Sequence, residues 1–208
     1  MSSPTTTQTT ARSTHDEHIL VVPRADFFPH GFWHGLQHAD LDQYMSLIQQ
    51  HKLFIPRSLA EQDPTYKQII PYLVFMHNDH IFMMQRRADA SEIRLRNKYS
   101  IGIGGHIRQE DIEGATIFDW ARREFYEEVN YTGAIDVTPL GIINDDSDAV
   151  GQVHAGLALL IRGQSNAITV RSELKSGQLL PLDACSMYKN NMENWSIYIV
   201  DELSHRHL

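Results

Sequence analysis

The sequence predicts a mixed α/β sandwich in a single domain, and three observations lead to that prediction. Several short stretches are rich in β-branched and aromatic residues, two or three stretches have helical periodicity, and strands and helices do not alternate strictly. A chain of 208 residues is long enough for one substantial core with additions. We therefore expect a disordered tail at 1–18 and one domain at 19–208, with an N-terminal decoration at 19–66.

The first half of the chain is expected to supply one helix and several strands. A short strand at 19–22 precedes Pro23, and 69–76 and 80–85 form a hairpin, followed by a strand at 99–103. Asp40 is placed to cap the helix. The apolar residues of that helix recur at i, i+3, i+4 and i+7, namely Leu41, Tyr44, Met45 and Ile48.

The second half is expected to contain two helices and two strands. Thr116 and Asp119 have the spacing of a capping box, so a helix should run from Ile117 to about Val129. Strands at 135–143 and 153–161 flank the acidic residues 145–148, for which a solvated turn is the expectation rather than a second cation site. A last helix is expected at 187–203, where Trp195, Ile199 and Leu203 follow at steps of four.

The helix predicted at 117–129 carries an unusual group of carboxylates. Helical geometry places Glu124, Glu127 and Glu128 in one sector beside an apolar sector. Like charges at this spacing repel unless a cation lies over them, and Mg²⁺ prefers oxygen ligands. Arg123, four residues before Glu127, is placed to pair with that carboxylate. Gly104 and Gly105, just before the helix, would let a phosphate approach the backbone closely.

This region resembles the Nudix box, G-x5-E-x7-R-E-U-x-E-E-x-G-U, where U is a bulky apolar residue. The second half of the box matches Arg123 to Tyr131 with one exception, Asn130 in place of glycine. After glycine, asparagine is the residue that best tolerates the left-handed conformation in which a chain often leaves a helix. The segments 63–72 and 99–106 also resemble a poorly characterised Nudix subgroup of predicted phosphoesterases.

The first half of the box departs from the family pattern. Five residues separate Gly105 from Asp111, but eleven residues, where the family has seven, separate Asp111 from Arg123. Counting back from Arg123 puts Ala115 at the position of the family's glutamate. We interpret the loop as carrying a four-residue insertion, with Asp111 or Glu113 as the replacement for the missing glutamate.

The resemblance implies a Nudix-like (MutT-like) α/β/α sandwich with a mixed sheet and an N-terminal extension, in which 104–131 form the loop and helix of the site. It implies a hydrolase that cuts a phosphoanhydride of a nucleoside diphosphate-X or a related phosphorylated small molecule, with Mg²⁺ or Mn²⁺. Glu124, Glu127 and Glu128 would be metal ligands and Arg123 would orient them. The expected substrate-binding residues are Gly104, Gly105, Asp111 and Arg57, and Glu173 is one candidate for the general base. The family suggests a homodimer.

The irregular loop keeps an alternative open. A catalytically degenerate Nudix domain would bind a nucleotide or a protein without cutting it. The presence of Arg123 and the three carboxylates of the helix favours catalysis over binding alone, because a site that has its full ligand set usually binds its metal.

Composition restricts the partners. The net charge of −8 leaves no general basic field for a nucleic acid polymer. Cys185 is the single cysteine, so an intrachain disulfide is excluded and a reducing compartment, the cytoplasm, is the expectation. We expect no membrane association, because no apolar run is long enough to span a bilayer.

Overall fold

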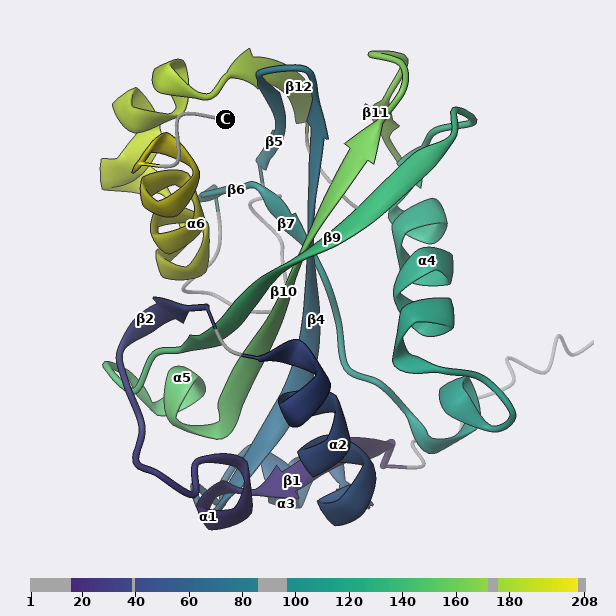
Figure 1. Cartoon of the computed structure of the whole chain (residues 1–208), viewed down its shortest axis with the longest axis vertical. Coiled ribbons are helices and arrows are strands. Elements are labelled where there is room, and N and C mark those ends of the chain that lie inside the picture. Colours follow the sequence, from purple (N-terminus) through teal and green to yellow (C-terminus); the bar gives the residue numbers. More distant parts are fainter. Residues whose placement is uncertain (1–15, 39, 86–96, 172–175, 206–208) are drawn as a thin grey trace, which may run out of the picture.

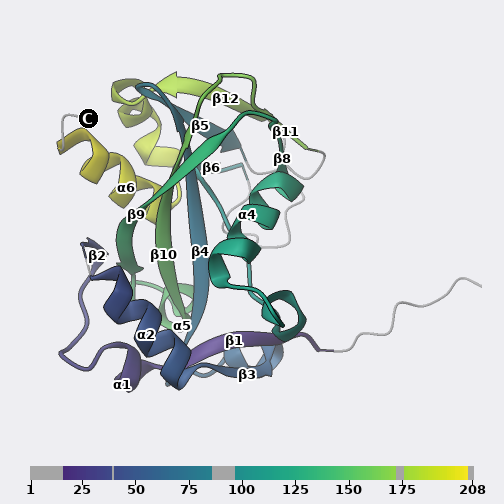
Figure 2. The ribbon, with the colours of Figure 1, turned by 45° about the vertical axis from the view of Figure 1, so that its right-hand side comes forward.

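The computed structural model describes residues 16–38, 40–85, 97–171 and 176–205. One large mixed sheet forms the centre, with α4 on one face and α6 on the other (Figures 1 and 2). In chain order the elements are β1 (His18–Pro23), α1 (Arg24–Phe27), β2 (Gly35–Gln37), α2 (Leu41–His51), β3 (Leu53–Pro56), α3 (Arg57–Ala60), β4 (Tyr66–His77), β5 (His80–Gln85), β6 (Tyr99–Ser100), β7 (Gly102–Ile103), the 3-10 helix η2 (Gln109–Ile112), α4 (Ile117–Glu128), β8 (Val129–Asn130), β9 (Ile135–Asn144), α5 (Ala149–Val153), β10 (His154–Gly163), β11 (Thr169–Val170), β12 (Ser176–Pro181), the 3-10 helix η3 (Asp183–Asn191) and α6 (Asn194–His205).

The order of the main sheet is β12-β5-β4-β10-β9-β2. Strands β4 and β10 run parallel at its centre, with Leu73 beside Leu159, whereas the other pairs are antiparallel. This combination is the mixed sheet that the sequence predicts. None of the helices in the described ranges is long and apolar enough to cross a membrane.

Strand β4 explains why the sheet needs a helix on each face. Leu73 and Phe75 belong to the core under α4, while Tyr72 and Val74 belong to the core under α6. Successive side chains of a strand point to opposite faces, so a strand that is buried on both sides appears in the sequence as a continuous apolar run. Helix α4, which carries the three glutamates, is thereby held against a strand that is buried on both faces.

The N-terminal decoration is part of the sheet. Strand β1 pairs with β3 and β4, and β2 adds to the outer edge of β9. Asp40 caps α2 as predicted, accepting hydrogen bonds from the backbone N–H groups of Asp42 and Gln43. The prediction placed Asp16 in the tail, yet its carboxylate accepts hydrogen bonds from Ser58.

Two predicted elements are interrupted in the structure. The strand predicted at 99–103 is divided into β6 and β7, because the Ile101 N–H donates to the Ser196 hydroxyl instead of to a neighbouring strand. The bounds predicted for the last helix, 187–203, are also wrong. The chain forms η3 and then α6, and between them Glu193 N donates to Tyr99 O, which holds an extended segment against β6.

Candidate active site

The loop after β7 brings two glycines against β4 and the site helix. A Cβ atom on Gly104 would lie 2.2 Å from the Pro71 carbonyl oxygen, so only glycine fits there. A Cβ atom on Gly105 would lie 3.0 Å from Oε1 of Glu124. The sequence predicted this juxtaposition of a glycine backbone and a carboxylate. The Glu124 carboxylate therefore lies beside main chain that carries no side chain.

Helix α4 has the bounds and the cap that the sequence predicts. Thr116 accepts a hydrogen bond from Asp119 N, and the Asp119 carboxylate accepts one from Thr116 N in return. Trp120, Ala121 and Phe125 are buried in the core between the helix and the sheet. This burial fixes the rotation of the helix, which in turn fixes where the three glutamates emerge.

The three glutamates differ in environment. Glu124 and Glu128 are half-buried, whereas the side chain of Glu127 is 62% exposed and lies 3.6 Å from Arg123 between Oε1 and Nε. Burial, together with the negative charges of Glu128, Glu127 and Asp111, raises the pKa of Glu124 to about 7. Among the described residues, no three His, Cys, Asp or Glu side chains are gathered closely enough to hold a metal ion. The carboxylates therefore share one side of the helix without converging.

The raised pKa of Glu124 has a consequence for stability. A folded-state pKa of about 7 against a reference of 4.5 means that the folded protein holds this proton more tightly than the unfolded chain. We expect the metal-free protein to lose stability as the pH rises from about 4.5 to about 7. Thermal unfolding in a chelator across that range measures the loss.

The Glu124→Gln variant provides the comparison for this prediction, because glutamine keeps the shape and has no charge to bury. Its unfolding temperature should fall less over the same pH range. Equal pH dependence in the variant and the wild type would show that another group causes the loss.

Arg123 is anchored by Asp111. Its Nη2 donates to Asp111 Oδ1 at 2.7 Å, and Asp111 also accepts hydrogen bonds from the backbone and the guanidinium of Arg108. Burial opposes ionisation of Asp111, but the hydrogen bonds from Arg108 and the charges of both arginines hold the pKa of Asp111 below its ordinary value. Of the two candidates to replace the missing glutamate, Asp111 is the one that contacts Arg123, whereas Glu113 is exposed.

Arg57, a predicted substrate-binding residue, and His106 lie near this loop. Arg57 pairs with Glu61 at 2.8 Å and with Glu17 at 3.6 Å. His106 Nε2 lies 2.6 Å from the Gln68 side-chain oxygen, and burial, followed by the charges of Arg57 and His154, lowers the pKa of His106 to about 3. Glu173 lies outside the described residues. The roles assigned to Arg57 and Glu173 stay predictions.

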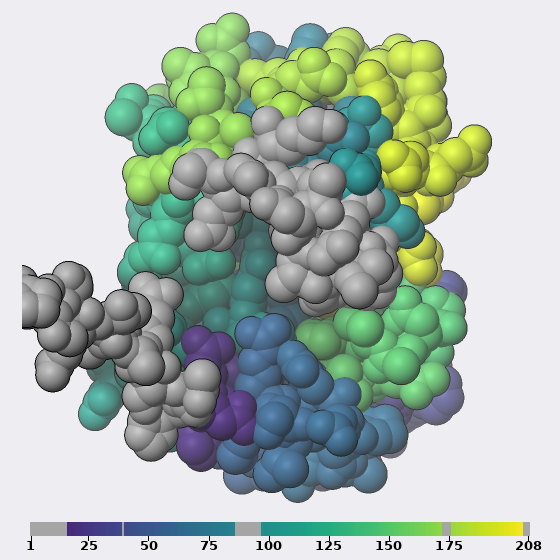
Figure 3. Space-filling view, turned by 180° about the vertical axis from the view of Figure 1, so that it is seen from behind, coloured from purple at the N-terminus to yellow at the C-terminus, as the bar shows by residue number. Residues whose placement is uncertain are grey.

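The face of the molecule seen in Figure 3 is hollowed beside the site helix. The recess lies between the teal surface, which includes α4, and the blue surface, which includes β3 and α3. Arg57 is the first residue of α3. The recess gives room for a substrate beside α4.

The acidic turn after β9 is not the solvated turn that the sequence predicted. Asp145 is buried and accepts hydrogen bonds from Asn194 and Tyr198. Asp146 pairs with Arg24 and with the fully buried Lys67. The distance from Lys67 Nζ to Asp146 Oδ1 is 2.9 Å. Both carboxylates are therefore used by the protein to tie the turn to neighbouring elements. Cys185 is free and buried.

Comparison with known proteins identifies the family. A search against family models found no match. Protein YmaB of Bacillus subtilis (strain 168) is 34% identical over 203 residues, which cover 90% of this chain and 98% of YmaB. Tm1382, a protein assigned to the Nudix hydrolases, is 30% identical with a TM-score of 0.74, and the match covers 90% of this chain and 98% of Tm1382. The chain belongs to the Nudix hydrolase family. The Nudix-like α/β/α fold predicted from the sequence is thus confirmed.

More distant structures share the fold alone. The Nudix domain of Shewanella oneidensis NrtR, solved with ADP ribose, has a TM-score of 0.55 at 14% identity, covering 74% of this chain and 100% of that domain. DR0079 of Deinococcus radiodurans has a TM-score of 0.51 at 15% identity, covering 72% of this chain and 90% of DR0079. Both comparisons support the same overall fold.

Proposed function

We propose that this Nudix hydrolase uses Mg²⁺ or Mn²⁺ to cut a phosphoanhydride in a nucleoside diphosphate-X or a related phosphorylated small molecule. The observation that carries the proposal is the half-buried Glu124 carboxylate beside Gly105, with Glu127 and Glu128 on the same side of the helix. The ADP ribose bound by the NrtR Nudix domain is a compound of this class and supports the choice of substrate.

The residues fit a hard divalent cation. Glu124, Glu127 and Glu128 offer only oxygen ligands, and a cation would relieve the repulsion that raises the pKa of Glu124. Glu127 is exposed, so its carboxylate can reorient towards Glu124 at little cost while Arg123 stays beside it. A bound divalent cation would supply charge neutralisation on the diphosphate and lower the pKa of a coordinated water.

The chain's own residues hold and orient the reacting groups. The backbone at Gly104 and Gly105 lets the diphosphate approach, because neither residue carries a side chain. Arg123 positions Glu127, and Asp111 in turn fixes the guanidinium of Arg123. Arg57, the first residue of α3, is proposed to contact a phosphate oxygen.

A degenerate binding domain is the second candidate. It is favoured by Ala115 at the position obtained by counting back from Arg123, and by carboxylates that are not gathered into a metal site within the described residues. The two candidates differ in product formation. A substrate that binds and stays intact in the presence of metal would indicate the binding domain.

The test is a panel of nucleoside diphosphate-X compounds, nucleoside triphosphates and dinucleotides, each incubated with the protein and Mg²⁺ or Mn²⁺. We expect one class to yield two phosphate-bearing products, or one such product and free phosphate. Chelation of the metal should stop the reaction. Saturable binding of a panel member by calorimetry, without turnover by any member, would contradict the proposed hydrolysis.

Asp111 is expected to be a positioning residue for Arg123. The variant Asp111→Asn keeps the side-chain shape but loses the ion pairs, so hydrolysis should fall by about 10- to 100-fold and metal affinity should fall with it. Glu113→Gln, with the same change of charge in the same loop, is the matched control. Equal activities of the two variants would remove Asp111 from the site.

A cytoplasmic location and a homodimer also stay predictions. Sedimentation of the purified chain measures the assembly state, and fractionation of the source cells measures the location.

A further inference from the structure

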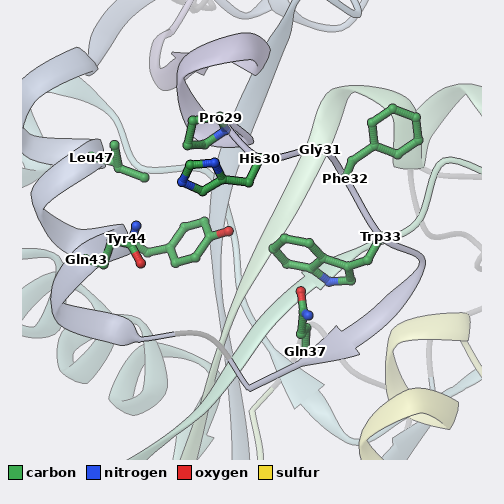
Figure 4. A pocket seen from close by; sticks show the side chains of 9 residues that line it. All are labelled: Pro29, His30, Gly31, Phe32, Trp33, Gln37, Gln43, Tyr44 and Leu47. Carbon is green, nitrogen blue, oxygen red and sulfur yellow. The ribbon is translucent and has the colours of Figure 1, made fainter.

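A pocket with a volume of about 300 Å³ lies in the N-terminal part of the chain, between the loop after α1, strand β2 and helix α2 (Figure 4). Its lining residues all fall between 29 and 47, so none comes from the loop and helix at 104–131 that carry the candidate active site. The volume is at the lower end of the range for small-molecule sites.

The aromatic walls of the pocket are packed in place. The Trp33 ring meets Phe28 edge-on at a centroid distance of 5.1 Å and Tyr44 edge-on at 6.0 Å. The Trp33 carbonyl oxygen accepts a hydrogen bond from the Asn144 side chain at 2.6 Å, which ties the loop to β9. Asp40 caps α2 one turn before Tyr44. A ligand would therefore meet a largely preformed site.

Several polar side chains of the pocket make no hydrogen bond with the described part of the protein. Within the described chain, the side chains of His30, Gln37, Gln43 and Tyr44 make no hydrogen bond with the protein. His30, Gln37 and Gln43 are exposed to solvent and Tyr44 is half-buried, whereas Trp33 Nε1 is buried without an acceptor. Figure 4 shows the Tyr44 hydroxyl directed between His30 and Trp33, with Gln37 beside the indole nitrogen. Burial raises the pKa of Tyr44, so its hydroxyl stays a donor. A buried donor without a partner is costly, and a ligand acceptor would remove that cost.

The lining excludes some ligands. Among the described residues, no Asp, Glu, Lys or Arg lines the pocket, so these residues offer no carboxylate, ammonium or guanidinium partner for a charged ligand. Aromatic rings offer a stacking surface, and two glutamine amides offer both donors and acceptors. Such a combination suits a flat, uncharged ring with polar edges.

We propose that this pocket is a second binding site, separate from the catalytic loop and helix, for a neutral planar heteroaromatic ring with hydrogen-bond donors and acceptors on its edge, as in a nucleoside. The ring packs against Trp33, and its edge pairs with Tyr44 and the amides of Gln37 and Gln43. Binding at this pocket does not depend on the hydrolase chemistry, because it uses none of the residues of α4.

The test titrates adenosine, guanosine, cytidine and uridine into the full chain by calorimetry, up to the millimolar range. We expect saturable binding of at least one nucleoside at one site per chain. Tyr44→Phe, which removes only the hydroxyl, should weaken that binding by about three- to tenfold. Gln43→Ala, on the surface of α2, should weaken it by a similar factor.

Two control variants test whether a loss of nucleoside binding comes from the pocket itself. Tyr188→Phe removes a hydroxyl in η3 and should bind as the wild type does, and so should Glu127→Gln on α4. Circular dichroism melts confirm that each variant is folded. The proposal is overturned if no nucleoside binds saturably, if Tyr44→Phe and Gln43→Ala both bind as tightly as the wild type, or if Glu127→Gln abolishes binding.

Discussion

Replacing Glu127 and Glu128 together by glutamine is expected to lower hydrolysis by about a thousandfold or more, because a catalytic metal supplies several kcal/mol of transition-state stabilisation. Glu127 is exposed and Glu128 is half-buried, so glutamine fits at both positions and the fold should be retained. The measurement is kcat/KM for the best substrate of the panel at saturating Mg²⁺.

The matched control is the double variant Glu110→Gln, Glu113→Gln. It changes the net charge by the same amount in the loop before α4, where both side chains are exposed. Its kcat/KM should stay within about twofold of the wild type. A tenfold or smaller loss in the α4 double variant would mean that these carboxylates do not bind a catalytic metal.

Replacing Asp146 by alanine is expected to destabilise the fold strongly, with a loss of about 3 to 5 kcal/mol in the free energy of unfolding. Lys67 has a side chain with no solvent exposure, and Asp146 is its carboxylate partner at 2.9 Å. The Gly151 and His154 carbonyl oxygens, at 2.9 and 3.1 Å, would remain as acceptors but carry no full charge to balance the ammonium group. Urea unfolding measures the free energy.

Lys67→Met is the comparison for that prediction. Methionine fills a similar volume without a charge, so the protein should lose less stability than in Asp146→Ala, even though the two carbonyl oxygens lose their donor. Asp146 would still pair with Arg24. If Lys67→Met were the more damaging of the two changes, the buried charge would not be the source of the destabilisation.

Local signals in the sequence predicted the part of the site that lies on α4. The bounds of this helix follow from a capping box and an apolar period, both of which act within a few residues. The hairpin of β4 and β5 is similarly local, with Asn78 in the left-handed region at φ 53°. For these elements the residues that decide the structure are neighbours in the chain.

Contacts between distant segments could not be predicted. The replacement for the missing loop glutamate was left open between Asp111 and Glu113, because the inserted loop changes the spacing and only the folded η2 turn brings Asp111 to the guanidinium of Arg123. The pairing of Lys67 with Asp146 joins β4 to the turn after β9, and no local pattern marks it. The same holds for the break before α6, which depends on a hydrogen bond to Tyr99.

Mn²⁺ binding tests the central claim most directly, because it needs no knowledge of the substrate. Electron paramagnetic resonance of free Mn²⁺ during titration gives the affinity of the wild type, the Glu127→Gln, Glu128→Gln variant and the Glu110→Gln, Glu113→Gln control. Our account predicts that the wild type and the control bind Mn²⁺ alike and that the α4 variant binds at least tenfold more weakly. Equal Mn²⁺ affinity in all three proteins would contradict a metal site on α4.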